Sequence, residues 1–170
     1  FRVYMPDKPD KYGRKAYLVC ESTSGYIWNL EIYTGQSIKE LVDLLGPNLL
    51  DKGYHLYQDN YYNSVELSEI LRRGTYVCGT LRLNRGAPKE LKDKVKIFKK
   101  GETAFAKKGQ VLTQVWKDKR DVKLISTIHM AQVVESEKTN QNGEKISMPE
   151  IIGDYNVYMK GVDRADQMMH

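Results

Sequence analysis

The stretch Gly53–Ser64 constrains the fold more than any other part of this chain. Its residues read G-Y-H-L-Y-Q-D-N-Y-Y-N-S, and the segment Tyr54–Gln58 is rich in aromatic and large side chains, as short strands are. Asp59 follows directly and breaks the strand pattern. An acid at a strand end lies where open α/β sheets usually build their sites. Taken alone, Asp59 is also compatible with an ordinary turn aspartate.

A helix start follows this turn. Asn63 or Ser64 supplies a helix cap, and Glu66 lies three residues after Asn63, which is the capping-box spacing. Apolar residues at helical spacing then extend the helix to Arg73. The stretch therefore predicts a strand, an acidic turn and a helix in succession.

Patterns elsewhere also predict an α/β chain. Apolar runs predict further strands, of which the second and third form a hairpin: Phe1–Met5, Lys15–Glu21, Tyr26–Tyr33 and Thr75–Leu81. Helical spacing predicts helices over Ser37–Leu45 and from Val162 onward. Alternation predicts an antiparallel meander of Thr103–Ala106, Val111–Lys117 and Val122–Met130. Ser136–Ser147 has the composition of a polar loop.

The positive charge of the chain is concentrated in one segment. The net charge is +5, yet Arg85–Lys123 contains 13 Lys or Arg against 5 Asp or Glu, a net +8, so the remainder sums to −3. Such an excess favours a polyanionic partner, because Lys and Arg neutralise phosphate charge. A solvated lysine-rich surface is the alternative. The hydrophobic content of 41% indicates a globular protein and excludes a disordered tail.

Three aromatic residues are predicted to lie in the core. Trp28 occurs in an apolar strand pattern. Phe105 and Trp116 lie inside the basic segment, where they either fill the core of the meander or stack on an unpaired base. The core is the favoured interpretation for both.

Three acids occupy positions that can bring them together. Glu21 and Asp59 each end a predicted strand, and Asp163 begins the last helix, with Asp166 on the same face one turn later. Carboxylates are costly to hold close together unless a cation lies among them, and Mg²⁺ prefers oxygen ligands. Two such ions would activate an attacking water or 3′-hydroxyl and stabilise the leaving oxygen of a phosphodiester. Because the chain has 22 acids, spacing alone does not single these out.

Three motifs carry a resemblance to a known family. The chain opens with F-R-V-Y-M-P-D-K-P-D-K-Y-G, continues with Y-Q-D-N-Y-Y-N-S, and closes with Y-N-V-Y-M-K-G-V-D-R-A-D-Q-M. In this order, over nearly the whole chain, they resemble the transposase domain of the piggyBac family, which includes domesticated relatives. The resemblance implies an α/β, RNase H-like fold, a mixed sheet with flanking helices that carries a β-rich insertion before the last catalytic helix. Residues 1–82 and 131–170 would form this core, and residues 83–130 the basic insertion.

The resemblance also implies an enzyme. The family performs cut-and-paste DNA transposition by metal-dependent strand cleavage and strand transfer. By motif position, the catalytic and metal-binding acids are Glu21, Asp59 and Asp163, and Asp166 is a supporting acid. The implied cofactor is Mg²⁺ or Mn²⁺, as two ions. The implied partner is double-stranded DNA, with transposon ends and a TTAA target, bound by a homodimer of the full-length protein in the nucleus.

Glu21 departs from the family pattern. The family has C-D-S where this chain reads Cys20-Glu21-Ser22. The extra methylene adds about 1.5 Å of reach, and Mg²⁺ demands near-ideal octahedral geometry. A misplacement of about 1 Å can cost about 10²-fold in rate. The alternative function is therefore a domesticated, catalytically impaired transposase-derived protein that binds DNA or chromatin.

Within and beside the basic segment, several residues are candidates for contact with DNA phosphates. They are Asn60, Arg82, Arg85, Lys89, Lys92, Lys99, Lys100, Lys107 and Lys108.

The remaining features bound the cellular context. Cys20 and Cys78 lie in strand patterns without a metal-ligand spacing, and reduced core thiols are favoured over a disulfide. No run approaches the ~18 apolar residues of a membrane span, so no membrane partner is expected. The chain lacks an initial Met and ends at His170 within a predicted helix, so we expect a fragment of a longer intracellular protein.

Overall fold

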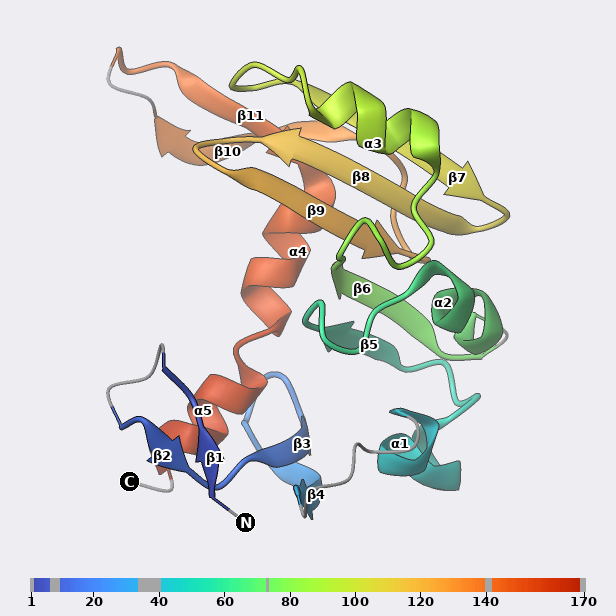
Figure 1. Ribbon diagram of the computed structural model, residues 1–170, viewed down its shortest axis with the longest axis vertical. Coiled ribbons are helices and arrows are strands. Elements are labelled where there is room, and N and C mark those ends of the chain that lie inside the picture. Colours follow the sequence, from blue (N-terminus) through green and yellow to red (C-terminus); the bar gives the residue numbers. More distant parts are fainter. Residues whose placement is uncertain (1, 7–9, 34–40, 73, 140–141, 169–170) are drawn as a thin grey trace. The chain divides into compact units, whose positions relative to one another are not determined.

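The chain folds into two compact units in the computed structural model. Residues 2–6, 10–33, 41–72, 74–139 and 142–168 are described. One unit consists of Phe1–Leu50 together with Met159–His170, and the other of Asp51–Tyr158 (Figure 1). Among the described residues, no helix has the length and apolar character needed to cross a membrane.

A five-stranded mixed sheet forms the framework of the unit Asp51–Tyr158. Its strand order is β5 (His55–Gln58), β6 (Tyr76–Thr80), β9 (Asp121–Ser126), β8 (Val111–Lys117) and β7 (Thr103–Lys108). β5 and β6 are parallel, and the other neighbouring pairs are antiparallel. The parallel pair is joined by the helix α2 (Val65–Leu71), since parallel neighbours require a crossover connection. The predicted strand, acidic turn and helix, and the predicted meander, are therefore confirmed.

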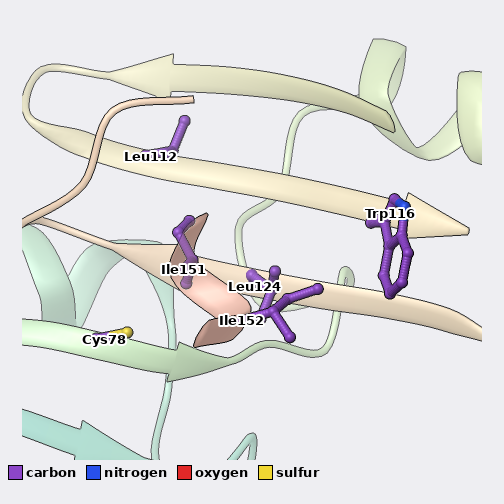
Figure 2. Close-up of a cluster of buried hydrophobic side chains, with 6 residues drawn as sticks. All are labelled: Cys78, Leu112, Trp116, Leu124, Ile151 and Ile152. Carbon is purple, nitrogen blue, oxygen red and sulfur yellow. The ribbon is translucent and has the colours of Figure 1, made fainter. Parts of the chain in front are cut away.

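The sheet is covered on both faces, which explains why β8 is buried along most of its length. Its odd-numbered residues contact two helices: Val111 packs in a cluster with Val65 of α2, and Val115 packs with Leu91 of α3 (Lys89–Val95). On the other face, Figure 2 shows Ile151 and Ile152 of α4 (Glu150–Tyr158) beside Leu112, Trp116 and Leu124. Alternation along one strand thus supplies two separate cores.

Two segments of this unit differ from the sequence-based prediction. The predicted polar loop Ser136–Ser147 is wrong, because it lies largely within the hairpin of β10 (Val133–Thr139) and β11 (Lys145–Pro149). Ile146 and Met148 of β11 pack against the core cluster, so every second residue suffices to anchor this polar hairpin. The helix α3 lies in the lysine-rich stretch that shows no clean period, since only Leu91 and Val95 are buried there.

The other unit is built on short hairpins. β1 (Val3–Tyr4) pairs with β2 (Tyr12–Gly13), and β3 (Ala16–Cys20) pairs antiparallel with β4 (Ile27–Ile32). The helix α1 (Leu41–Leu49) is interrupted at Gly46, whose φ is 64°, which confirms the predicted stop at this glycine. The predicted cap at Ser37 lies outside the described residues. The last helix, α5 (Gly161–Met168), begins within one residue of its predicted start.

Aromatic burial and cysteine state give mixed outcomes. Trp116 is buried as predicted, but Phe105 is 56% exposed and Trp28 is 52% exposed, so their predicted core positions are wrong. Alternation identifies the face of a strand, and it does not show whether anything covers that face. Both cysteines are free thiols, with Cys78 buried and Cys20 half-buried.

The mixed α/β class is confirmed, whereas the RNase H-like core and the insertion stay predictions. The strands of residues 83–130 do not form a separate sheet. Instead, β9 pairs with β6, with Gly79 opposite Ile125.

Candidate functional site

Asp59 lies immediately after β5, at the carboxyl end of the parallel strand pair. Its side chain is exposed, and its Oδ1 accepts a hydrogen bond of 2.8 Å from the backbone N–H of Tyr61. An aspartate that accepts from the amide two residues on forms an Asx turn, which fixes the carboxylate relative to its own backbone. The turn therefore presents one acid to solvent in a defined direction.

Two arginines from the segment after β6 brace this turn. The Nε of Arg82 donates to Oδ1 of Asn60 at 2.8 Å, and the Nη1 of Arg85 donates to the carbonyl of Tyr61 at 2.5 Å. Both arginines and Asn60 are sequence-based candidates for DNA contact, and that role stays a prediction. What the structure shows is that the acidic turn is tied to the end of the neighbouring strand.

The Glu21 carboxylate is held by the turn that joins β3 to β4. Its Oε1 accepts from the amide and hydroxyl of Thr23 at 3.1 and 2.6 Å. Its Oε2 accepts from the amide and hydroxyl of Ser24 at 2.6 and 2.5 Å. A carboxylate has about four lone-pair sites, so four donors occupy all of them. The longer glutamate side chain thus folds back onto its own turn.

These hydrogen bonds change the acidity of Glu21. Donation by the Ser24 hydroxyl, then by the Thr23 hydroxyl and the two amides, lowers the pKa of Glu21 to about 2. These donors bind the charged form of the carboxylate and stabilise it, which is why the pKa of this exposed group is lowered. Glu21 is therefore ionised throughout the physiological range.

The helix α5 packs against the same turn. Arg164 donates through Nη1 to the carbonyl of Ser22 at 3.0 Å and also to the carbonyl of Thr23. A Cβ at Gly161 would lie 3.0 Å from the carbonyl oxygen of Glu21, so a side chain at the helix start would have to push this turn away by a few tenths of an ångström. Ala165 is buried in the same region. The turn thus has its amides bound by Glu21 and its carbonyls bound by Arg164.

This packing places two of the three candidate acids in one compact unit. Asp163 lies in the first turn of α5 between Gly161 and Arg164, and its side chain is exposed. Asp166 lies in the same helix, but its side chain is outside the described part of the chain. Asp59 belongs to the other unit. Among described residues, no three His, Cys, Asp or Glu side chains form a group that could hold a metal ion.

The donor chemistry of the acids suits a hard divalent cation. Asp59, Asp163 and Glu21 supply only carboxylate oxygens, and Mg²⁺ prefers oxygen ligands. Asp59 and Asp163 are exposed and fit this role as they stand. Glu21 fits it only if at least one of its four hydrogen bonds is given up, because each of its oxygens already accepts two. The structure therefore distinguishes the exposed Asp163, and Asp59 with its single hydrogen bond from Tyr61, from Glu21, which accepts four.

The basic candidates are mostly exposed on α3, on the segment after it and on β7. Lys89 and Lys92 belong to α3, with Lys92 half-buried. Lys99 and Lys100 are exposed in the segment between α3 and β7. Lys107 and Lys108 are exposed at the end of β7. Lys108 forms an ion pair of 2.6 Å with Glu69. Lys107 donates to the Met130 sulfur, so it lies on the opposite face of β7 from Lys108. The name basic surface is used below for all six side chains, which are drawn from both faces of the sheet: Lys89, Lys92, Lys99, Lys100, Lys107 and Lys108.

Ser126, His129 and Asp154 form a hydrogen-bonded chain that resembles a catalytic triad in residue types but has a structural role. The Ser126 hydroxyl lies 2.8 Å from Nδ1 of His129, and Nε2 of His129 lies 3.0 Å from Oδ2 of Asp154. Ser126 is fully buried, and its Oγ accepts from the amides of Ile128 and His129. Its hydroxyl hydrogen therefore points to Nδ1, and Nε2–H donates to Asp154. A buried hydroxyl that already accepts two amides is no nucleophile, and the chain ties α4 to the end of β9.

Several residues of the site were missed by sequence reasoning. Thr23 and Ser24 follow Glu21 at the spacing of a local side-chain turn, so their role had a signal in the sequence. Arg164 had none, since it is 142 residues from Ser22. Ser64 caps α2 through a 3.0 Å bond from the Leu67 amide, whereas Asn63 has another role.

Comparisons with known proteins agree with the resemblance inferred from the sequence. Residues 1–170 match the family described as Transposase IS4. Among solved structures, the chain is similar to a piggyBac transposase determined by cryo-electron microscopy in a synaptic complex with hairpin DNA. The TM-score is 0.75 and the sequence identity 28%, over 99% of this chain and 36% of that one. The chain thus spans little more than a third of the length of the protein it matches.

Proposed function

From the premise that this chain belongs to the Transposase IS4 family, we propose that it is the catalytic domain of a DNA transposase. Its reaction would be metal-dependent cleavage of DNA strands followed by strand transfer, as in cut-and-paste transposition. The observation that carries the proposal is the packing of α5 on the Glu21 turn. Gly161 and Arg164 hold Asp163 and Glu21 in one unit, as two acids of one catalytic set would require.

The proposed metal ligands are Asp59, Asp163 and Glu21, with Asp166 as a supporting acid. The bound ions, Mg²⁺ or Mn²⁺ and two in number, would supply activation of the attacking hydroxyl and charge stabilisation at the leaving oxygen. Asp59 contributes a carboxylate whose direction is set by the Tyr61 amide. Glu21 would contribute only after releasing at least one hydroxyl of Thr23 or Ser24.

The proposed substrate is double-stranded DNA. Support comes from the similar piggyBac transposase, whose structure contains hairpin DNA, and from the basic surface of this chain. Lys99 and Lys100 are exposed, and their ammonium groups form no ion pair with any other described residue, so they can approach phosphates without breaking one. Transposon ends, a TTAA target, action as a homodimer of the full-length protein and a nuclear location belong to the same proposal.

One specific observation favours a second function, a transposase-derived protein that binds DNA without cutting it. The Glu21 carboxylate has all its lone pairs occupied by Thr23 and Ser24. If these bonds persist in the presence of divalent ions, the first acid is a structural element of the turn. DNA binding by the basic surface would then remain, and strand cleavage would be lost.

Strand nicking tests the proposed function. The full-length protein would be incubated with a duplex that carries a transposon end flanked by TTAA, and with Mg²⁺ or Mn²⁺, as wild type, Asp59→Asn and Asp51→Asn. Asp51 is a matched control, since it is an exposed aspartate of the same unit whose positive φ of 57° an asparagine also adopts. The proposal expects nicking by the wild type and Asp51→Asn, and none by Asp59→Asn. Equal nicking by all three proteins would exclude Asp59 from the chemistry.

A further inference from the structure

Asn63 lies at the ends of the two parallel strands that lead to the acidic turn. Its side chain is fully buried, although it follows the exposed Asp59 by only four residues. A buried carboxamide needs partners for both its N–H groups and its oxygen, because an unpaired buried polar group is costly. The question is therefore which groups it binds.

The Asn63 amide binds backbone carbonyls from both strands. Its Nδ2 donates to the carbonyl of Thr80 at 2.7 Å, and to the carbonyls of Gln58 and Asp59 at 3.2 Å each. Its Oδ1 accepts from Nε2 of Gln58. One side chain thus joins the end of β5, the backbone of Asp59 and the residue that ends β6.

The space for this amide is provided by Gly79. A Cβ at this position would lie 2.5 Å from Nδ2 of Asn63 and 2.0 Å from the carbonyl oxygen of Gln58. Gly79 is also the residue that pairs with Gln58 in the β5–β6 register. The strand pair and the carboxamide therefore fit together only when residue 79 lacks a side chain.

We propose that Asn63 is a positioning residue for Asp59. Its side-chain amide acts as a clamp, which binds the backbone carbonyls of Gln58, Asp59 and Thr80 and so fixes the backbone from which the Asp59 carboxylate extends. The carbonyl of Asp59 is fixed by Nδ2 of Asn63, while its carboxylate is fixed by the Tyr61 amide. Both the backbone and the side chain of Asp59 are thereby restrained. The inference rests on the proposed function, in which Asp59 is a metal ligand. Partners behind a ligand typically change metal affinity by about 10–100-fold when removed.

Asparagine suits this role better than the other small polar residues. Aspartate has no donor and would place a charge against three carbonyl oxygens, and threonine offers one donor for three acceptors. Alanine offers none. Asn63 differs in this respect from the adjacent Ser64, whose hydroxyl accepts from Leu67 and caps α2.

The test compares Asn63→Ala with Ser64→Ala, a neighbouring substitution that removes a cap and leaves the clamp intact. The first measurement is amide hydrogen exchange in the metal-free full-length protein. Asn63→Ala is expected to accelerate exchange of the Tyr61 amide by about tenfold, while Ser64→Ala accelerates the Leu67 amide and leaves Tyr61 unchanged. Tyr61 exchange at the wild-type rate in Asn63→Ala would overturn the proposal.

The second measurement is Mn²⁺ affinity by electron paramagnetic resonance. Asn63→Ala should bind about tenfold more weakly than the wild type, and Ser64→Ala should bind with the wild-type affinity. Equal weakening in both variants would assign the effect to general loss of stability and overturn the positioning role. If Asn63→Ala does not fold, Asn63→Thr, with one donor, should give intermediate values in both measurements, and wild-type values would contradict the proposal. If the wild type itself binds no Mn²⁺, the proposed function fails, and the Tyr61 exchange still decides the role of Asn63.

Discussion

Ser24 donates both its backbone amide and its hydroxyl to one oxygen of Glu21, at 2.6 and 2.5 Å. Thr23 binds the other oxygen in the same way. The carboxylate of the first candidate acid is thus part of the structure of its own turn. Its availability to a metal ion depends on how firmly these four donors hold it.

The titration of Glu21 should reflect these hydrogen bonds. Its pKa is about 2, against an ordinary value of 4.5, chiefly because the Ser24 and Thr23 hydroxyls donate to the charged form. Since the folded-state pKa is depressed, the stabilisation is present above pH 4.5 and is lost as the pH falls through about 2. The ¹³C shift of the Glu21 carboxyl group measures this directly. A midpoint near 4.5 would show that the turn does not hold the carboxylate.

Removal of one hydroxyl should raise the pKa of Glu21. In Ser24→Ala the carboxylate loses the hydroxyl that lowers its pKa most, so its midpoint should move upward toward 4.5. Ser22→Ala is the matched control. Within the described part of the chain, the Ser22 hydroxyl is buried without a hydrogen-bond partner, so its removal should leave the Glu21 midpoint unchanged. The same ¹³C titration compares the two variants, and equal shifts would contradict the assignment.

A side chain at residue 79 should destabilise the unit Asp51–Tyr158. In Gly79→Ala the new Cβ would overlap the carbonyl oxygen of Gln58 and the Asn63 amide, at a cost of about 1–3 kcal/mol or more in the free energy of unfolding. Gly153→Ala, in α4, is the contrasting case, because among the described residues its Cβ would meet just the side chain of Met148, at 4.0 Å. It should stabilise by about 0.5–1 kcal/mol. Urea denaturation distinguishes the two, and similar free energies would contradict this packing.

Neutralising the basic surface should weaken DNA binding in a salt-dependent manner. Each lost phosphate contact lowers the slope of log K against log salt by about 0.9, so Lys99→Ala with Lys100→Ala should lower it by up to about 1.8. Lys145→Ala is the control, since this lysine lies on β11 near Glu135 and outside the basic segment. Fluorescence anisotropy with duplex DNA at several salt concentrations gives the slopes. Unchanged slopes in the double variant would assign these lysines to a solvated surface.

The sequence predicted the strands and helices correctly where the spacing of apolar residues and the turn residues indicate the same structure. The hairpin β3–β4, the strand and helix around Asp59, and the meander β7–β8–β9 all follow from local apolar spacing. The hairpin β10–β11 was missed because many of its residues are polar, such as Glu135 and Ser147, which face each other across the two strands. Trp28 was misplaced because a strand pattern does not reveal what covers its face.

The sequence predicted the acids of the candidate site, but it did not predict the contacts that hold those acids in place. Asp59 and Asp163 occupy the strand end and helix start that the sequence indicated. The hydrogen bond from Arg164 to the Ser22 carbonyl joins residues 142 positions apart. The burial of Asn63 depends on the absence of a side chain at Gly79. Such contacts follow from tertiary packing, on which local propensity carries no information.

The most direct test of catalysis by this chain is a nicking assay on the full-length protein as wild type, Glu21→Asp and Asp59→Asn. The duplex substrate would carry a transposon end flanked by TTAA, with Mg²⁺ or Mn²⁺ present. We predict that the wild type nicks DNA, that Glu21→Asp nicks at least as fast because it restores the aspartate of the family motif, and that Asp59→Asn is inactive. A silent wild type beside an active Glu21→Asp would contradict catalysis by the natural chain and leave DNA binding as its function.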